Sequence, residues 1–365
     1  METKLTYKSI YELLRKDILS GVYAEGVLMP TESVLSEKFG VSRPTVAKAY
    51  NKLQEEGLIT KKKGMGTIIN PSRKQKDKPR FGLLLPGAGE SEIFSIINDC
   101  LLRFSEEDRF DCLWEGATAS NADTRRELIE SCCNNYIKQG VDGIFFSPLE
   151  RVNDAHIINN EICKKIEEAG IPIILIDRDV CDIPSRSKHD LVSLDNFSAG
   201  CTMARHLVEC GCTDIHFVYR PDSAASVRLR LAGIRDTLLR HDIPLSENNI
   251  HCVNPEDPET AAAINIKSGK TGIICANDST AAVLMSTLGD AGHDVSTDFL
   301  ICGYDDMKYS SHLRYPLTSF RQPCVEMADT SVELMMRRLS APASPTLTVT
   351  LTGSIVVRES TKFKK

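Results

Sequence analysis

From residue 80 onward, short apolar runs alternate with segments of helical periodicity, and this alternation restricts the fold more than any other feature of the chain. The apolar runs, which we expect to be strands, are 81–85, 143–146, 171–176, 215–219, 273–276, 299–302 and 317–320. The helical patterns between them lie near 92–107, 123–139, 156–169, 197–210, 227–241, 257–268 and 278–292. Strands that alternate with helices and are apolar throughout are typical of parallel sheets covered on both faces. The sequence therefore predicts an α/β region, and its length suits two sheets rather than one.

Charge is distributed unevenly along the chain. Residues 1–80 hold 16 Lys and Arg against 9 Asp and Glu, so this segment carries +7, whereas the whole chain carries −6. The remainder is therefore acidic, at −13. A small basic module joined to a large acidic one indicates that a polyanion binds the first module only.

The basic module has the pattern of a helix-turn-helix. We expect helices over 4–20, from Pro30-Thr31 onward, and over 43–56, with a tight turn at Gly40-Val41 and Ser42 as the N-cap of the third helix. In a helix-turn-helix the second helix of the pair enters the major groove of DNA.

A basic hairpin follows these helices. Two β-prone runs surround the glycine-bearing turn at 61–66, which next to a helix-turn-helix forms a wing. Its lysines can displace counterions from phosphates, and its glycines let the backbone approach a groove closely.

This module resembles the winged-helix domain of the GntR family of bacterial regulators, and the residues that match are 28–32, 40–46, 57–59 and 64–67. The resemblance implies that Arg43, Thr45 and Gly66 contact DNA. Lys48 stands where the family usually has Arg, so it lacks the bidentate fork that reads guanine. The predicted DNA-binding residues are Thr31, Arg43, Pro44, Thr45, Lys48, Lys62, Lys63, Gly66 and Thr67.

Polar side chains follow the apolar runs of the acidic module. Asp177-Arg178, Asn277 and Asp305 come at the ends of three expected strands, Gln322 follows a fourth, and Arg230 lies on an expected helix. Ligands of open α/β sheets bind beyond the carboxyl ends of the strands. Acids, amides and arginines gathered there can form paired donor and acceptor bonds with ring hydroxyls.

The acidic module resembles the effector-binding half of the LacI family and the related periplasmic sugar-binding proteins. The matching segments are 195–196 with Gly200, 228–233, 276–278, 303–306 and 316–322. The resemblance implies a two-subdomain fold and an effector site, with Ser147 and Phe94 as further carried-over positions. The implied effector-binding residues are Phe94, Ser147, Asp177, Arg178, Arg230, Asn277, Asp305 and Gln322.

Other roles for these side chains stay open at this point. Arg178 with Asp177, or Arg230 with Asp305, can equally form structural ion pairs. Trp114, the single tryptophan, can stack on a sugar or pack in a core or an interface. His216, in an apolar run, is expected to be a hydrogen-bonded core side chain.

The chain is expected to divide into three parts. Residues 1–70 form the winged helix-turn-helix, 71–79 a basic linker, and 80–365 the effector domain. Within the effector domain we expect subdomain A at about 80–191 plus 324–343, and subdomain B at about 192–321 plus 344–360.

Taken together, these features predict a sugar-responsive transcriptional regulator of the repressor type. Its partners would be double-stranded operator DNA, a monosaccharide effector and a second copy of the chain. We expect a pentose or a 6-deoxyhexose, such as arabinose, ribose or fucose, because the first loop offers one aromatic side chain and few additional donors. A purine or a sugar phosphate is the alternative effector.

We expect no enzymatic activity and no cofactor. An enzyme fused to a DNA-binding arm is the alternative, but the pyridoxal type needs a longer second module and a Schiff-base lysine. The beginning of the sequence lacks an uninterrupted apolar core, so we expect no secretory signal, no membrane partner and a cytoplasmic location. The 13 cysteines are irregularly spaced, which favours reduced thiols over disulfides or a metal site.

Overall fold

A computed structural model describes residues 6–19, 22–23, 27–56, 58–62, 66–69, 78–86, 92–107, 109–114, 122–152, 154–267 and 270–363. The chain divides into two compact units, Met1–Pro79 and Arg80–Lys365. Each unit has its own hydrophobic core.

The described residues of the first unit form three helices and a two-stranded antiparallel hairpin, which confirms the predicted winged helix-turn-helix. Its elements are α1 (Tyr7–Leu19), α2 (Glu32–Phe39), α3 (Arg43–Glu55), β1 (Ile59–Lys62) and β2 (Gly66–Ile69). Gly40 ends α2 with a φ of 61°, a left-handed conformation that favours glycine and turns the chain into α3. Apolar side chains from all three helices and both strands form one buried core.

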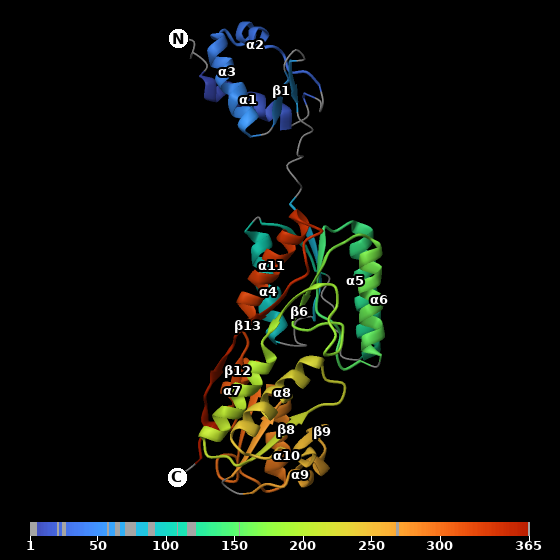
Figure 1. Cartoon of the computed structure of the whole chain (residues 1–365), viewed down its shortest axis with the longest axis vertical. Coiled ribbons are helices and arrows are strands. Elements are labelled where there is room, and N and C mark those ends of the chain that lie inside the picture. Colours follow the sequence, from blue (N-terminus) through green and yellow to red (C-terminus); the bar gives the residue numbers. More distant parts are fainter. Residues whose placement is uncertain are drawn as a thin grey trace. The chain divides into compact units, whose positions relative to one another are not determined.

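The second unit begins with a lobe built on a six-stranded parallel sheet of order β13-β7-β6-β5-β3-β4. Its strands are β3 (Arg80–Leu84), β4 (Asp111–Leu113), β5 (Gly143–Phe146), β6 (Ile173–Ile176), β7 (Asp190–Leu194) and β13 (Thr348–Leu351). The helices that cover one face are α4 (Glu92–Glu106) and α11 (Cys324–Ser340), and those that cover the other are α5 (Ala122–Gln139) and α6 (Ala155–Glu168) (Figure 1).

The second lobe repeats this architecture with the sheet order β14-β12-β11-β10-β8-β9. Its strands are β8 (Asp214–Tyr219), β9 (Ile250–Cys252), β10 (Thr271–Cys275), β11 (Phe299–Tyr304), β12 (Thr318–Arg321) and the antiparallel β14 (Ser354–Val356). The helices are α7 (Asn196–Glu209) and α8 (Ala225–Arg240) on one face, and α9 (Pro258–Ala263) and α10 (Asp278–Asp290) on the other. Three short 3-10 helices are η1 (Glu247–Asn249), η2 (Lys308–Ser311) and η3 (Glu359–Thr361).

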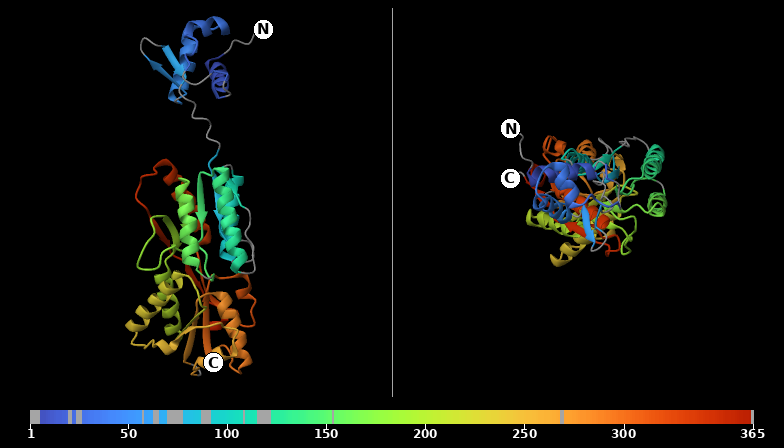
Figure 2. Two further views of the ribbon diagram at one scale, coloured as in Figure 1. Left: turned by 90° about the vertical axis from the view of Figure 1, so that its right-hand side faces the viewer. Right: turned by 90° about the horizontal axis from the view of Figure 1, so that it is seen from above.

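Figure 2 shows the two lobes of this unit end to end, and the chain crosses between their sheets three times. The crossings run from β7 into α7, from β12 into α11, and from β13 into β14. This is the two-sheet fold expected from the alternating pattern. Because all but one of the strand pairs are parallel, the carboxyl ends of both sheets can line a common cleft.

The structure differs from the expected boundaries in two places. The sequence assigns 344–360 to the second subdomain, whereas β13 lies in the first sheet, where it pairs with β7. Its residues alternate between exposed and half-buried, so the apolar-run criterion does not detect it. The helix expected over 257–268 ends at Ala263, because the segment after Ile264 leads into β10 rather than continuing the helix.

Candidate functional site

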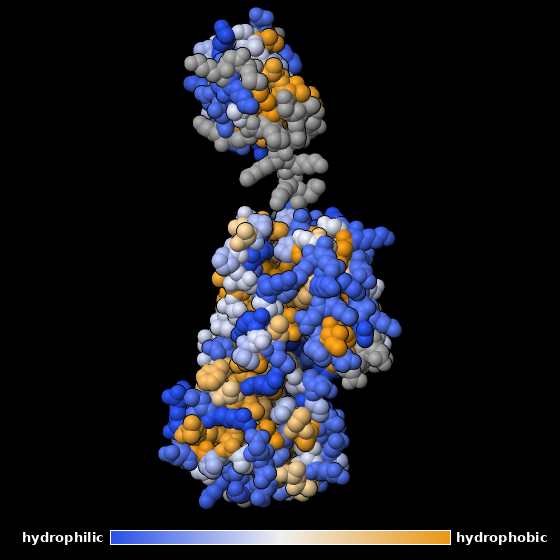
Figure 3. All heavy atoms as spheres, turned by 45° about the vertical axis from the view of Figure 1, so that its right-hand side comes forward, coloured by the Kyte–Doolittle hydropathy of each residue, from blue (hydrophilic) through white to orange (hydrophobic). Residues whose placement is uncertain are grey.

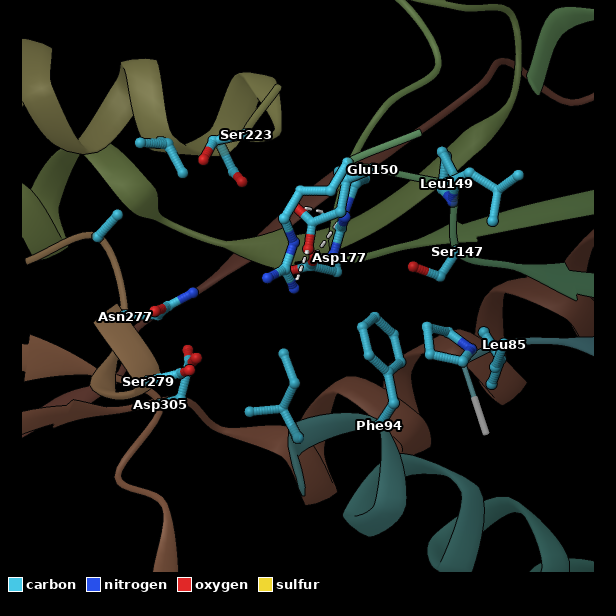
Figure 4. Close-up of a pocket in the computed structure, with 18 of the residues that line it drawn as sticks. Leu85, Phe94, Ser147, Leu149, Glu150, Asp177, Ser223, Asn277, Ser279 and Asp305 are labelled. Carbon is cyan, nitrogen blue, oxygen red and sulfur yellow. Dashed lines mark hydrogen bonds and ion pairs between the residues drawn. The ribbon is translucent and has the colours of Figure 1, made fainter. Parts of the chain in front are cut away.

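A cavity of about 430 Å³ lies between the two lobes of the second unit, at the carboxyl ends of their strands. All eight residues predicted to bind an effector line it: Phe94, Ser147, Asp177, Arg178, Arg230, Asn277, Asp305 and Gln322. Figure 4 shows Phe94 and Ser147 on one side of the cavity, facing Asn277 and Asp305 on the other. The fold therefore brings together, from two lobes, side chains that are up to 228 positions apart in the chain.

Asp177 and Arg178 form a buried ion pair at the end of β6. Asp177 has a φ of 75°, and its Oδ2 atom lies 2.6 Å from Arg178 Nη2 and accepts from Nε at 2.8 Å. A third residue, Glu150, lies 2.9 Å from Arg178 Nη1. Burial opposes the charge, yet the two carboxylates raise the pKa of Arg178 above its ordinary value. The structural ion pair left open by the sequence is thus present, within the wall of the cavity.

Arg230 enters the cavity from α8, which packs closely against α7. Its Nε donates to Asn196 Oδ1 at 2.8 Å, and its Nη1 donates to the carbonyl oxygen of Ala276. Its guanidinium carbon lies 4.3 Å from the centroid of the Tyr304 ring. The alternative ion pair with Asp305 is not formed, because Arg230 is held by these other partners.

Asp305 and Gln322 form the floor of the cavity on the second lobe. Gln322 Nε2 donates to Asp305 Oδ1 at 2.7 Å. Burial raises the pKa of Asp305, against the opposing effects of Arg230 and Gln322. Asn277 lies beside them as the N-cap of α10, where its Oδ1 accepts from the N–H of Thr280 at 2.8 Å and its amide nitrogen stays available.

Among the described residues that line the cavity, three buried polar atoms have no hydrogen-bond partner. They are Nε of Arg125, the hydroxyl of Ser147, whose residue is 2% exposed, and Oε1 of Gln322, whose residue is 5% exposed. Leaving such groups unpaired costs about 1–3 kcal/mol each, and a ligand that pairs them recovers this free energy. A ligand with several hydrogen-bonding groups can therefore pair with the cavity.

Sequence reasoning missed several residues that line the cavity: Arg125, Glu150, Arg151, Arg220, Ser223 and Ser279. Glu150 lies four residues beyond β5, so the strand-exit criterion applied to the end of that strand could have found it. Arg125 lies on a helix, and no such signal marks it. Trp114 does not line the cavity but packs, partly buried, against the core of the first lobe.

His216 is a buried core residue, as the sequence predicts. Its Nδ1 lies 2.9 Å from His251 Nε2, and its Nε2 lies 3.3 Å from Asp214 Oδ2. All 13 cysteines are free. Within the described residues no group of three or more His, Cys, Asp or Glu could hold a metal ion, and no helix is both long and apolar enough to cross a membrane.

Helix α3 and the hairpin carry most of the residues predicted to bind DNA. Arg43, Pro44 and Lys48 are exposed along α3, and the side chain of Thr45 pairs with Ser42 at 2.8 Å. Ser42 occupies the N-cap position of α3, as the sequence predicts, and its side chain makes no cap bond to the backbone.

The remaining predicted residues lie on α2 and the hairpin. Thr31 caps α2 through its hydroxyl, which accepts from the N–H of Val34 at 3.4 Å. In the hairpin Lys62 and Gly66 are exposed and Thr67 is half-buried, whereas Lys63 lies outside the described residues. The neighbouring Lys61 is engaged by Glu32 and Asn51, which ties β1 to α2 and α3.

Comparisons with known proteins match the two units separately. Residues 6–69 match the family described as bacterial regulatory proteins, gntR family, and residues 204–361 match the periplasmic binding protein-like domain. The arabinose metabolism transcriptional repressor of Geobacillus stearothermophilus is 23% identical over 355 residues, which cover 94% of each chain.

Solved structures share the fold of the second unit. A LacI family regulator of Enterococcus faecium with bound ribose has a TM-score of 0.60 and 24% identity, and the match covers 78% of this chain and 100% of that one. The lac repressor dimer bound to operator and an anti-inducer has a TM-score of 0.62 and 20% identity, over 79% of this chain and 96% of that one.

Proposed function

We propose that this protein is a repressor released from its operator by a monosaccharide. The chain joins a DNA-binding domain of the gntR family of bacterial regulatory proteins to a periplasmic binding protein-like domain of the kind found in LacI-type regulators. A protein of this domain combination is a transcriptional regulator and not an enzyme. Because operator DNA is its partner, we place its action in the cytoplasm.

The observation that carries this proposal is the pairing chemistry of the interlobe cavity. Arg178, Arg230 and Asn277 present donors, Asp305 presents acceptors, and Ser147 and Gln322 each present an unpaired buried atom. A polyol ring can donate and accept at every hydroxyl, so one ring can satisfy both lobes at once. A ligand that lacks one of these hydroxyls leaves a buried group unpaired, which is the basis of specificity.

The size and the lining of the cavity favour a small aldose. Phe94 is the aromatic residue among its described lining residues, and it can cover one face of a single sugar ring. The arabinose repressor similarity and the ribose-bound structure support a pentose in particular. We propose arabinose, ribose or a 6-deoxyhexose such as fucose as the effector.

We further propose that α3 reads bases in the major groove. Arg43 and Thr45 lie in its first turn, as a recognition helix requires, and Lys48 and Lys62 are exposed and free to reach phosphates. Gly66, at a φ of 102°, begins β2 of the wing. Thr31, Pro44, Lys63 and Thr67 complete the proposed contact surface.

We propose that the regulator acts as a homodimer on an inverted repeat. The lac repressor structure is described as a dimer on its operator, and two-fold protein symmetry matches a palindromic site. The paired helices α4 and α11 of the first lobe expose the apolar side chains of Ile96 and Val325, which a second copy could cover. Figure 3 shows that hydrophobic side chains also reach the surface of the second unit on the face in view.

Sugar binding would act by closing one lobe on the other. Closure changes the geometry of the dimer and hence the spacing of the two DNA-binding units, so affinity for the operator falls. This requires that the sugar bind the closed form better, by a coupling of about 1–3 kcal/mol.

The experiment is a thermal-shift screen of the full chain against a panel of monosaccharides, followed by operator binding with and without each sugar that shifts the melting temperature. We expect arabinose, ribose or fucose to stabilise the protein by about 2.7 kcal/mol at a concentration of 100 times Kd. The same sugar should weaken operator binding by at least about fivefold. If no sugar stabilises the chain, or if the stabilising sugar leaves operator affinity unchanged, the proposal is wrong.

A further inference from the structure

The carboxylate of Asp278 is fully buried and binds the segment that follows β11. Asp278 is the first residue of α10 and is 0% exposed. Its Oδ2 accepts hydrogen bonds from the N–H of Met307 at 2.9 Å and from the hydroxyl of Ser310 at 2.7 Å. Its Oδ1 accepts from the hydroxyl of Ser319 at 2.6 Å. The same oxygen lies against β11, because a Cβ atom at Gly303 would be 2.4 Å from it. The carboxylate is therefore enclosed by the end of β11 and by the chain that leads from it into β12.

Two residues of this segment, Asp305 and Asp306, have a backbone conformation that is unusual for a residue with a side chain. Their φ angles are 104° and 51°, in the left-handed region that mainly glycine adopts. Such a conformation persists only where the surrounding structure holds it. Asp305 also lines the cavity, and Figure 4 shows it on the same side of the cavity as Asn277. The direction of the Asp305 side chain therefore depends on what holds this turn.

Three successive backbone N–H groups of the turn have defined partners. The N–H of Asp305 donates to a carbonyl oxygen of β12 at 2.9 Å. The N–H of Asp306 donates to Oγ of Ser319 at 2.9 Å, and that of Met307 donates to Asp278. The hydroxyl of Ser319 in turn donates to Asp278. The second and third N–H groups therefore both depend on the Asp278 carboxylate, one through Ser319 and one directly.

We propose that Asp278 is a positioning residue for the effector, which acts directly and through Ser319 to keep the turn at 305–307 in the conformation that presents Asp305 to the cavity. The proposal rests on the proposed function, since it concerns how that cavity recognises its sugar. Asp278 directly follows Asn277, which lines the same cavity from the start of α10. The carboxylate thus fixes Asn277 and Asp305 relative to each other, although the two residues come from different elements.

Loss of one of these hydrogen bonds should weaken sugar binding, because Asp305 would be correctly placed in a smaller fraction of the protein. The apparent Kd of a ligand equals its intrinsic Kd divided by the fraction in the competent form. The net contribution of one hydrogen bond corresponds to about fivefold in an equilibrium constant, so we expect effects of that size. The turn should not open completely, because Arg321 and Arg358 still bind the carboxylate of Asp306.

Ser319→Ala and Ser360→Ala form a matched pair of variants for the test. Both serines are 0% exposed, and each hydroxyl accepts one backbone N–H and donates one hydrogen bond. Ser360 makes its bonds elsewhere in the same lobe, because it accepts from Thr318 at 2.8 Å and donates to the carbonyl oxygen of Ile301 at 2.6 Å. Both variants should therefore lose stability, whereas only Ser319→Ala should disturb the turn.

The first measurement needs no sugar. Hydrogen exchange of the full chain, read by mass spectrometry on overlapping peptides, should show the amides of residues 306 and 307 exchanging about fivefold faster in Ser319→Ala than in Ser360→Ala. Unchanged exchange in Ser319→Ala, or equal acceleration in both variants, would overturn the proposal.

Asp278→Asn covers the case in which Ser319→Ala does not fold. The amide has nearly the shape of the carboxylate but one acceptor oxygen in place of two, so it cannot accept from the donors on both sides. Burial, and then the neighbouring Asp305, raise the pKa of Asp278 to about 7, so the proteins are compared at about pH 8, where the carboxylate is mostly ionised. Asp278→Asn should accelerate the same amides, and exchange like that of the parent would contradict the role of Asp278.

Calorimetric titration of the full chain with L-arabinose then separates positioning from simple stability. The Kd should be about fivefold weaker in Ser319→Ala and within about twofold of the parent in Ser360→Ala, even where urea unfolding shows the same loss of stability in both. Equal affinities in the two variants would contradict the positioning role. If the parent binds no sugar of the panel, the proposed function fails, whereas the exchange experiment still decides whether Asp278 and Ser319 hold the turn.

Discussion

Gly200 of α7 lies directly against the backbone of Arg230 in α8. A Cβ atom at position 200 would be 2.1 Å from the carbonyl oxygen of Arg230, and one at Gly233 would be 2.0 Å from the carbonyl oxygen of Phe197. Both distances are far below ordinary van der Waals contact, so the two helices cross at a separation that only glycine permits at both positions. This crossing sets where Arg230 enters the cavity.

Gly200→Ala should therefore destabilise the protein and weaken sugar binding together. Because the clash is with backbone, the helices must separate, at a cost of about 1–3 kcal/mol. Urea unfolding measures the loss of stability, and titration calorimetry measures the loss of affinity. The control is Gly289→Ala in α10, where a Cβ meets nothing within 4 Å. That variant should be neutral or slightly stabilising, and a similar loss in both would rule out the close crossing as the cause.

Arg230→Ala should abolish the response to sugar while leaving operator binding intact. Arg230 is 5% exposed and its guanidinium donates two hydrogen bonds at the cavity, so its loss removes a donor to the sugar and leaves Asn196 Oδ1 without its donor. Asp305→Ala should likewise abolish the response to sugar while leaving operator binding intact. Operator binding in a gel-shift assay, with and without sugar, measures both. A mutant that still releases DNA on sugar addition would show that the effector binds elsewhere.

The strands that are buried along their whole length could be predicted from the sequence. The run around Ile173–Ile176 is buried on both faces, so it is apolar throughout and was recognised as a strand. Strands such as Asp111–Leu113 and Thr348–Leu351 are short and partly exposed, and nothing in their composition separates them from loops. Adjacent apolar residues can also differ, since Val34 of α2 is 53% exposed whereas Leu35 is buried in the core.

Some residues of the candidate site could likewise be predicted from the sequence, and others could not. Asp177, Asn277 and Asp305 could be located because each ends a strand, and parallel strands deliver their ends to one edge. The ion pair between Arg228 of α8 and Asp182 could not be found in this way. It joins residues of two lobes, and no local pattern of the sequence records how those lobes meet.

Arg43→Ala should remove specific operator binding and leave sugar affinity unchanged. Arg43 is exposed at the start of α3, and a bidentate contact to guanine contributes about 1–3 kcal/mol of discrimination. Binding to operator and to a scrambled duplex should therefore become similar. Calorimetric titration with sugar is the control for folding, and a loss of both activities would indicate misfolding instead.

Operator affinity should fall steeply as salt rises, and Lys48→Gln should reduce that slope by about one unit. The lysine is exposed on α3 and lacks the fork of arginine, so we expect it to contact phosphate rather than a base. Fluorescence anisotropy between about 50 and 200 mM salt measures the slope. Lys61→Gln is the comparison, because Lys61 is engaged by Glu32 and Asn51. A flat salt series would contradict the phosphate contacts altogether.

The buried histidines of the second lobe should make the protein less stable as pH falls from about 6.5 toward 4. Burial, and then the neighbouring His216, lower the pKa of His251 to about 4, and burial lowers that of His216 against the opposing effect of Asp214. The ordinary pKa of histidine in an unfolded chain is about 6.5. The unfolded state thus binds a proton that the folded state refuses, so stability is complete above about pH 6.5 and is lost below it.

For His251 alone this amounts to about 1–2 kcal/mol between pH 7 and pH 5. The contact responsible is the 2.9 Å approach of His251 Nε2 to His216 Nδ1, which requires one ring to accept and therefore to stay neutral at that atom. Urea unfolding at the two pH values measures the loss, and carboxylates elsewhere contribute to it in any variant. His251→Gln keeps a donor near His216 but cannot titrate, so its loss should be smaller than that of the parent by the stated amount. Equal losses in the two proteins would mean that the histidine pair is not what makes the second lobe sensitive to acid.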